Sequence, residues 1–460
     1  MKFETNPADL FSSKAANSIP IRAVTKGDLK AKKSGISAKE REWAKSSNFD
    51  GSSGQHCLVP NADGTLHSVL FGLGDGISEK TGFELGRLAG QLPDGTFKLD
   101  TEISNADLGW ALGGYRFAKY KKSKSKSAKL IPDGGRPQRR LIEGSYIARD
   151  LINIPASDMG PDALEKAFRK IATKHKAKVQ VVKGDQLLKR NFPMVHAVGR
   201  ASVQAPRVLD LRWGKANHPK VTLIGKGVTF DTGGLNIKPG NSMSLMKKDM
   251  GGAANVLGLA HMIMDARLPV RLRVIIGAVE NAISGNAFRP GDVLPSRNGM
   301  SVEIGNTDAE GRLVLGDCLT LGDEEKPQIM IDMATLTGAA RVALGPDLPP
   351  FYTDDDAFAA EILSASDACF DPLWRMPLWQ PYNAMMTSKV ADVNHINTSG
   401  AGFAGSITAA LFLQRFVSKT KSWVHFDIYG WTPAQKPWAP VGGEAQGIRA
   451  LYEVLSKRYG

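Results

Sequence analysis

The sequence has few cysteines, and none of them is spaced for a metal site or a redox motif. Cys57, Cys318 and Cys369 are the three cysteines among 460 residues, and no CxxC pair occurs. An odd number of widely separated cysteines argues against a disulfide framework and is typical of free thiols in a reducing compartment. We therefore expect a cytoplasmic protein.

Long apolar runs are also missing. No stretch approaches the ~20 consecutive apolar residues that a membrane helix needs. The first residues, MKFETNPADLFSSKAANSIP, contain an early lysine but neither the apolar core nor the cleavage site of a signal peptide. These absences predict a protein without a membrane partner and without a secretion signal.

Several common catalytic motifs do not occur. None of the eight histidines is followed by glutamate, so HExxH and the single-zinc proteases that use it are excluded. There is no GxSxG and no GxxxxGK[ST] segment, which removes the serine hydrolase elbow and the phosphate-binding loop. The glycines at 72, 74 and 76 do not fit GxGxxG and are interpreted as a turn.

What the sequence does contain is ordinary for a globular protein of two domains. Hydrophobic residues make up 42% and charged residues 23% of the chain, and 460 residues exceed one ordinary core. The net charge of +13 suits either solubility or an acidic partner such as nucleic acid. Because the basic residues are mostly dispersed, we favour solubility. The exception is KYKKSKSKSAK at 119–129, which is predicted to be an exposed linker or loop.

Periodicity changes along the chain and predicts an α/β protein. Short apolar runs between glycine-rich turns, such as 67–76 and 108–120, predict a small α/β unit. Apolar residues at helical spacing in 139–155 predict a helix that Pro155 ends. Beyond it, strands alternate with helices, which indicates a mostly parallel sheet covered on both faces. We predict an N-terminal domain at 1–138, a connecting helix at 139–155, and an α/β/α catalytic domain at 156–460.

Three glycine-rich segments carry an unusual density of charged residues. They are GKGVTFDTGGLNIKP after the apolar strand VTLI, KKDMGG before the helix GGAANVLGLAHMI, and NTDAEGRL. They contain Lys226, Asp231, Lys238, Asp249, Asp308, Glu310 and Arg312. Two of these segments adjoin predicted strands or helices at their ends, and ligands gather outside the carboxyl ends of strands in such sheets.

Taken singly, each of these residues has an ordinary explanation. Asp308 and Glu310 could lie in a solvated turn, Asp249 could cap a helix, and Lys226 could be a surface charge. Together, four carboxylates would repel one another unless divalent cations such as Zn, Mn or Mg neutralised them. In extended chain, Asp308 and Glu310 would share one face and could bridge two ions about 3.5–4 Å apart.

These segments resemble those of a known family. VTLIGKGVTFDTGGLNIKP, MSLMKKDMGGAA, NTDAEGRLVLGDCL and ATLTGAARVALG are ordered and spaced as in the leucine aminopeptidases, also called cytosol aminopeptidases. The resemblance covers about residues 140–460. For the N-terminal third it implies a small macro-like α/β domain, which precedes a larger α/β/α catalytic domain with a mostly parallel sheet.

The resemblance also implies a reaction and its residues. A water activated by two divalent ions, Zn or Mn, would release the first residue, leucine-like by preference, from peptides with a free N-terminus. Lys238 would act as an electrophile, and Arg312 would hold a bicarbonate base. The family further implies a homohexamer. The implied metal ligands are Lys226, Asp231, Asp249, Asp308 and Glu310, and the implied substrate contacts are Met246, Thr335, Leu336 and Gly338.

Two departures from the family and three alternatives complete the interpretation. Thr232 replaces a common serine, and PWAPVGGEAQGIRAL at 437–451 replaces a run that borders the substrate pocket, which leaves the side-chain preference open.

Three alternative functions remain. A two-metal phosphoesterase would need more histidine ligands. A basic nucleic-acid-binding protein would want aromatic residues among the lysines of 119–129. A macro-like binding module alone would leave two thirds of the chain without a role. The scattered histidines are expected to be structural, and His425, in a predicted strand, is the one that could instead support the site.

Overall fold

The computed structural model describes residues 3–31, 35–121, 128–133, 136–400 and 402–460. Contacts divide the chain into two units. The N-terminal unit runs through Glu143 and includes the later segment Ala434–Val441, and the larger unit comprises Gly144–Pro433 and Gly442–Gly460. The division falls inside one helix, α5 (Arg136–Asn153), which ends before Pro155.

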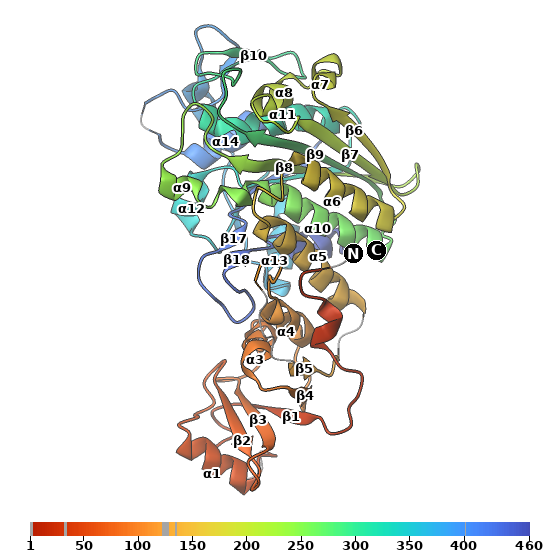
Figure 1. Ribbon diagram of the computed structural model, residues 1–460, viewed down its shortest axis with the longest axis vertical. Helices are drawn as coiled ribbons and strands as arrows, with labels where there is room; N and C mark the ends of the chain where they lie inside the picture. The colour runs from red at the N-terminus through yellow and green to blue at the C-terminus, as the bar shows by residue number, and fades with distance from the viewer. Residues whose placement is uncertain (1–2, 32–34, 122–127, 134–135, 401) are drawn as a thin grey trace. The chain divides into compact units, whose positions relative to one another are not determined.

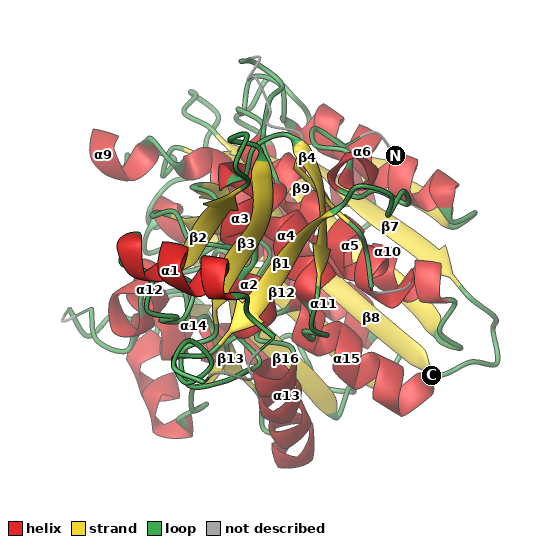
Figure 2. Cartoon of the chain, turned by 90° about the horizontal axis from the view of Figure 1, so that it is seen from below, coloured by secondary structure: helices red, strands yellow, loops and turns green. Residues whose placement is uncertain are grey.

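The N-terminal unit is a five-stranded sheet with helices packed on it (Figure 2). The strand order is β2-β3-β1-β4-β5, parallel except for the antiparallel pair β2–β3. The strands are β1 (Ile19–Val24), β2 (His56–Pro60), β3 (Leu66–Gly72), β4 (Gly95–Leu99) and β5 (Ala128–Leu130). The helices are η1 (Pro7–Leu10), α1 (Ala38–Ser46), α2 (Thr81–Glu84), α3 (Gly86–Gln91) and α4 (Ala106–Gly114). This is the small α/β unit that the sequence predicts.

The lysine-rich run at 119–129 is only partly a linker. Its last two residues belong to β5, which pairs in parallel with β4, and residues 122–127 lie outside the described ranges. Ala128 and Leu130 are buried while Lys129 between them is partly exposed. The prediction of an exposed loop was wrong here because backbone pairing at a sheet edge tolerates lysine. Three residues are also too few to show a period.

A late segment of the chain packs within the N-terminal unit. The ring of Trp438 meets that of Phe83 edge-on, with centroids 6.3 Å apart. A Cβ on Gly86 or Gly113 would approach the carbonyl oxygen of Pro437 to 2.7 or 2.4 Å, so only glycine leaves room there. The segment that departs from the family pattern therefore begins as part of this unit.

The larger unit is built on an eight-stranded sheet with the order β14-β13-β16-β12-β8-β9-β7-β6. The four central strands β16, β12, β8 and β9 are parallel, and antiparallel pairs flank them. Its strands are β6 (Lys178–Lys183), β7 (Arg207–Trp213), β8 (Lys220–Asp231), β9 (Arg271–Asn281), β12 (Ile329–Ala334), β13 (Pro350–Tyr352), β14 (Trp374–Arg375) and β16 (Ser422–Asp427). Two minor sheets comprise β10 (Val293–Pro295), β11 (Ser301–Glu303) and β15 (Val393–Asn394), and β17 (Trp431–Thr432) with β18 (Gly442–Gly443).

Helices cover both faces of this sheet (Figure 1). One face carries α6 (Pro161–Lys174) and α10 (Gly251–Ala266), the latter packed on α15 (Ile448–Tyr459), which in turn contacts α13 (Asp356–Ala368). The other carries α8 (Pro193–Gly199) and α11 (Glu310–Asp323), with α14 (Gly405–Gln414) against α11. The short helices are α7 (Gln186–Lys189), α9 (Gly240–Met243), α12 (Gly338–Leu344), η2 (Met246–Met250), η3 (Thr307–Ala309) and η4 (Gln380–Met386). The predicted α/β/α layers are confirmed.

Packing of α10 brings its N-terminus close to the end of β12. A Cβ on Gly252 would meet the carbonyl oxygen of Met333 at 2.0 Å, so the helix can come this near only with glycine. Residues 251–264 are buried all round, as expected for a helix inside a large core. Asp249, just before this helix, is thereby held at the carboxyl edge of the sheet. In the described ranges, no helix has the length and apolar character that crossing a bilayer needs.

Candidate metal centre

Three neighbouring strands end at one edge of the large sheet and deliver the polar side chains of the site. Asp231 closes β8 opposite Asn281, the last residue of β9, and Thr335 follows β12. Asp308 lies in η3 and Glu310 opens α11. The rule that ligands gather at the carboxyl ends of parallel strands therefore located the site from sequence.

Three carboxylates converge there. Oxygen atoms of Asp231, Asp308 and Glu310 all lie within 4.8 Å of one another. Asp249 joins them through Lys226, whose ammonium nitrogen lies 2.7 Å from Asp249 Oδ2 and 2.9 Å from Glu310 Oε1. The structure thus brings together all five residues that the sequence proposes as metal ligands.

Lys226 is buried, which excludes its interpretation as a surface charge. Its ammonium also donates to the carbonyl oxygen of Thr335 at 3.0 Å. A Cβ on Gly311 would lie 2.6 Å from Lys226 Cε, so glycine at this position of α11 makes room for the lysine. The glycine of NTDAEGR is therefore part of the site.

Lys238 bridges a different pair of carboxylates. Its ammonium nitrogen lies 2.9 Å from Asp231 Oδ2 and 2.5 Å from Asp308 Oδ1. The chain turns back after β8 at Gly233, whose φ of 87° suits glycine, and the amide of Lys238 donates to the carbonyl of Thr232. This turn brings the second lysine to Asp231 and Asp308, whereas Lys226 contacts Asp249 and Glu310.

The local geometry assumed for Asp308 and Glu310 was wrong. The sequence argument placed them on one face of extended chain, but Asp308 lies in a 3₁₀ turn and Glu310 is the first residue of α11. The two carboxylates converge because the turn and the helix start redirect them. Spacing alone cannot show which backbone conformation a DxE segment adopts.

Charge in the cluster is poorly balanced. Burial, reinforced by the charge of Asp231, raises the pKa of Glu310 well above its ordinary range and that of Asp308 to about 6. Burial alone would lower the pKa of Lys226, but the charges of Asp249, Glu310 and Asp231 outweigh it and raise that pKa. Both oxygens of Glu310 are buried; Oε1 faces the Lys226 ammonium at 2.9 Å, and Oε2 has no hydrogen-bond donor within the described part of the chain. Converging buried carboxylates with a spare oxygen fit divalent cations.

Neutral residues hold the carboxylates in place. Asn281 Nδ2 donates to Asp231 Oδ1 at 2.8 Å and to the carbonyl of Thr307 at 3.0 Å. Thr335 Oγ1 donates to Asp249 Oδ1 at 2.9 Å. Asn281 was not predicted from the sequence, although it directly follows the predicted strand VRLRVIIGAVE, where the same edge rule applies.

Arg312 is buried and held at one end only. Its Nη1 donates to the carbonyl of His395 at 2.7 Å, and its Nε has no hydrogen-bond partner among the described residues. Burial lowers the pKa of Arg312 to about 10, and burial with the charge of Arg312 lowers that of His395 to about 3. A guanidinium with a spare donor beside a neutral imidazole can receive an anion. His425, by contrast, pairs through Nδ1 with Asp332 at 2.6 Å rather than with a candidate ligand.

The candidate substrate residues lie around the cluster. Thr335 contacts Asp249 as described, and the amide of Leu336 donates to Asp427 Oδ1 at 3.0 Å. Gly338 opens α12, and an added Cβ there would meet no atom within 4 Å. Met246 opens η2, three residues before Asp249. Thr335 thus reaches the centre directly, and the others lie on the segments next to it.

Comparison with known proteins identifies the family. The model of the cytosol aminopeptidase family, catalytic domain, matches residues 146–452, and that of the M17 aminopeptidase, N-terminal domain, matches 19–132. The chain belongs to the cytosol aminopeptidase family. A probable cytosol aminopeptidase of Roseiflexus castenholzii is 40% identical over 372 residues, 75% of each chain. That of Aquifex aeolicus is 36% identical over 94% of each.

Solved structures similar to the chain have the same architecture. The cytosol aminopeptidase of Coxiella burnetii superposes with a TM-score of 0.93 at 44% identity, covering 98% of this chain and all of that one. The bottromycin maturation enzyme BotP, in complex with Mn, gives 0.85 at 30% identity over 96% of this chain and 100% of its own. As a cytosol aminopeptidase, the chain is a metallo-exopeptidase of the leucine aminopeptidase type with two domains, which confirms the family and fold expected from sequence.

Proposed function

We propose that this chain releases the N-terminal residue of peptides through two divalent cations, Zn or Mn, held by Lys226, Asp231, Asp249, Asp308 and Glu310. The approach of three carboxylates to within 4.8 Å carries the proposal. Two ions rather than one are supported by the second grouping, in which Lys226 contacts Asp249 and Glu310. No histidine belongs to this cluster in the described ranges, which disfavours the phosphoesterase alternative.

Cations bound here would supply Lewis-acid activation of water and of the scissile carbonyl. Lys226 can serve as a ligand only as a neutral amine, and neutralising a lysine at pH 7 costs about 4.6 kcal/mol from its ordinary pKa. Ion binding must therefore displace its proton, as metal binding generally does with protonated ligands. Lys238 has two carboxylate partners and keeps its charge, so it can donate to the oxyanion that develops on the carbonyl.

Arg312 fits the role of holding a bicarbonate. Its planar guanidinium can bind a carbonate group in bidentate fashion, and its Nε is a buried donor without a partner in the described part of the protein. Bicarbonate held there would take the proton of the attacking water. Because the neighbouring imidazole of His395 donates from Nε2 to the carbonyl of Asn306 and accepts the amide of Gly305 at Nδ1, it does not compete for this task.

The remaining features of the proposal follow the family. We propose Met246, Thr335, Leu336 and Gly338 as substrate contacts, leucine-like first residues as the starting expectation, a cytosolic location and a homohexamer. The location is supported by relatives named as cytosol aminopeptidases. We also propose the domain limits 1–138, 139–155 and 156–460; the family models, which match 19–132 and 146–452, support a change of domain between residues 132 and 146.

The test is hydrolysis of leucine p-nitroanilide with controlled metal. A chelator is expected to abolish turnover, and added Mn or Zn is expected to restore it, because the carboxylates cannot activate water without ions. N-acetyl-leucine p-nitroanilide, which lacks the free amine, serves as a control and should stay intact. Full activity in protein shown to be metal-free by elemental analysis would refute the proposal.

A small effect is expected from the lysine-rich run. Replacing the exposed Lys119 and Lys121 by glutamine should leave leucine p-nitroanilide hydrolysis within about twofold, because surface charge changes outside a site are usually minor. Gel shift with DNA on the same variant tests the alternative that the protein binds nucleic acid through this run. A shift that the wild type shows, that depends strongly on salt and that the variant loses, would support that alternative.

A further inference from the structure

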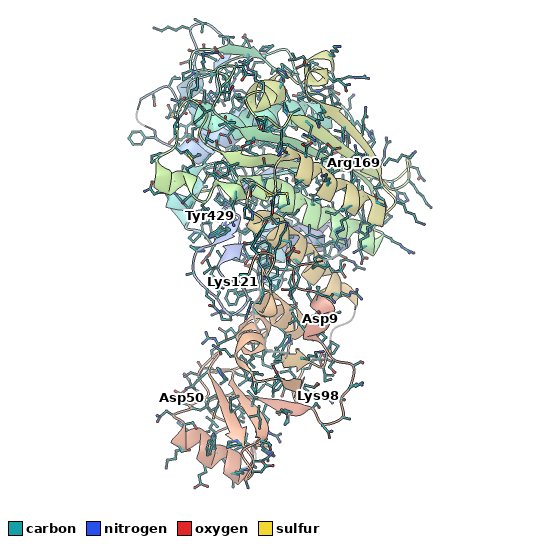
Figure 3. All side chains as sticks on the ribbon, viewed as in Figure 1. Asp9, Asp50, Lys98, Lys121, Arg169 and Tyr429 are labelled. Carbon is teal, nitrogen blue, oxygen red and sulfur yellow. The ribbon has the colours of Figure 1, made fainter. Side chains whose placement is uncertain are left out.

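Two cations meet over one aromatic ring beside the metal centre. Tyr429, labelled in Figure 3, follows β16 and lines a pocket together with Thr337, Ala340, Arg341 and Asp427. The ammonium nitrogen of Lys248 lies 4.8 Å from the centroid of the Tyr429 ring, and Cζ of Arg341 lies 5.4 Å from it. The two side chains come from η2 and α12, which are far apart in sequence.

Neither cation forms an ion pair or a hydrogen bond within the described ranges, although Lys248 is only 6% exposed. The carboxylates of Asp249 and Asp427 act on Lys248 by charge alone. Asp427 takes its hydrogen bonds from neutral groups: Oδ1 accepts the amides of Leu336 and Thr337, and Oδ2 accepts Thr337 Oγ1. Lys248 and Arg341 therefore keep donors for an anion in the pocket.

The pocket adjoins the metal centre through two short segments. Lys248 directly precedes the candidate ligand Asp249. On the other side, Thr335 bonds Asp249, and the next two residues bond Asp427 at the base of the pocket. The pocket is therefore joined to the candidate metal site by the segments that hold Asp249 and Thr335.

We propose that this pocket receives the side chain of the substrate's first residue and favours an acidic one, glutamate or aspartate. The inference rests on the proposed function and replaces the leucine-like preference as the expectation for this chain. The methylene groups of glutamate would pack on Tyr429 and Ala340, and its carboxylate would accept charge-assisted hydrogen bonds from Lys248 and Arg341.

The test compares kcat/KM for glutamate and leucine p-nitroanilides, which carry no other carboxylate. Wild-type protein should prefer glutamate, and Arg341→Met and Lys248→Met should each lower the glutamate-to-leucine ratio by about tenfold or more. Arg341 is exposed, so its variant remains informative if Lys248→Met folds poorly. Lys189→Met removes an exposed charge from α7, which lies well apart from α12 in Figure 1, and should leave the ratio and the activity unchanged.

A binding measurement gives a second readout. Calorimetric titration should show L-glutamate binding the wild type more tightly than L-glutamine, with the difference lost in Arg341→Met. If Arg341→Met and Lys248→Met lower kcat/KM for leucyl-glutamate as much as for glutamate p-nitroanilide, the two cations do not distinguish a first-residue carboxylate from a second-residue one. That result would overturn the proposal. An unchanged ratio in both variants would also overturn it while leaving the aminopeptidase intact. Failure to cleave any free N-terminal residue with metal present would instead refute the proposed function.

Discussion

Replacing Glu310 by alanine is expected to remove bound metal and hydrolysis together. Glu310 is 1% exposed, and within the described residues its Oε2 accepts no hydrogen bond while Oε1 faces Lys226. The carboxylates of Asp231 and Asp249 repel its charge, and divalent cations would remove that repulsion. We expect turnover to fall by at least about 10³-fold, beyond the 10–100-fold typical of residues that only support a ligand. Elemental analysis and leucine p-nitroanilide hydrolysis on one preparation measure both effects.

Two comparisons make this prediction specific. Asp308→Ala should behave in the same way, whereas Glu280→Ala, which removes a carboxylate from β9 next to Asn281 but outside the cluster, should retain its metal. Metal-free Glu310→Ala should unfold no earlier than the metal-free wild type, because it removes a buried carboxyl group that Asp231 and Asp249 repel. A variant that keeps both ions but loses activity would show that Glu310 is not a ligand.

The sequence predicted the location of this site better than its geometry. Alternating strands and helices, with charged glycine-rich segments at strand ends, predicted which residues converge, since parallel strands share one carboxyl edge. The conformation of the DxE segment was not predictable, because spacing does not distinguish an extended chain from a 3₁₀ turn that leads into a helix. Strand β5 was missed for a related reason. Backbone pairing, rather than side-chain pattern, makes its three residues a strand.

Contacts between distant segments lay beyond sequence reasoning. Lys248 and Arg341 meet at Tyr429 only because η2, α12 and the end of β16 adjoin one another in the fold. Likewise, Asn281 gains its role by facing Asp231 across the β8–β9 pair. Single residues of ordinary type carry no signal of this kind, since their function arises from a partner elsewhere in the chain.

The two lysines of the site lie in the same glycine-rich segment but have different surroundings. Their alanine variants should therefore differ in metal content and in turnover. Lys226 is enclosed by Asp249, Glu310 and the carbonyl of Thr335, whereas Lys238 is 14% exposed at its side chain and bridges Asp231 and Asp308. Lys226→Ala should lower metal occupancy. Lys238→Ala should keep both ions but lose turnover by about 10²–10³, the usual loss for one oxyanion donor.

Arg312→Ala provides the third member of this comparison. It should keep its metals and lose less activity than Lys238→Ala, because water can partly replace a displaced base. Added bicarbonate in degassed buffer should raise the wild-type rate but raise the Arg312→Ala rate much less, since that variant lacks the guanidinium that would hold the anion. Metal content and turnover measured on the same three preparations decide the roles. If Lys238→Ala loses its metals while Lys226→Ala keeps both, the ligand and the electrophile have been exchanged, because only a residue bonded to an ion can take that ion with it.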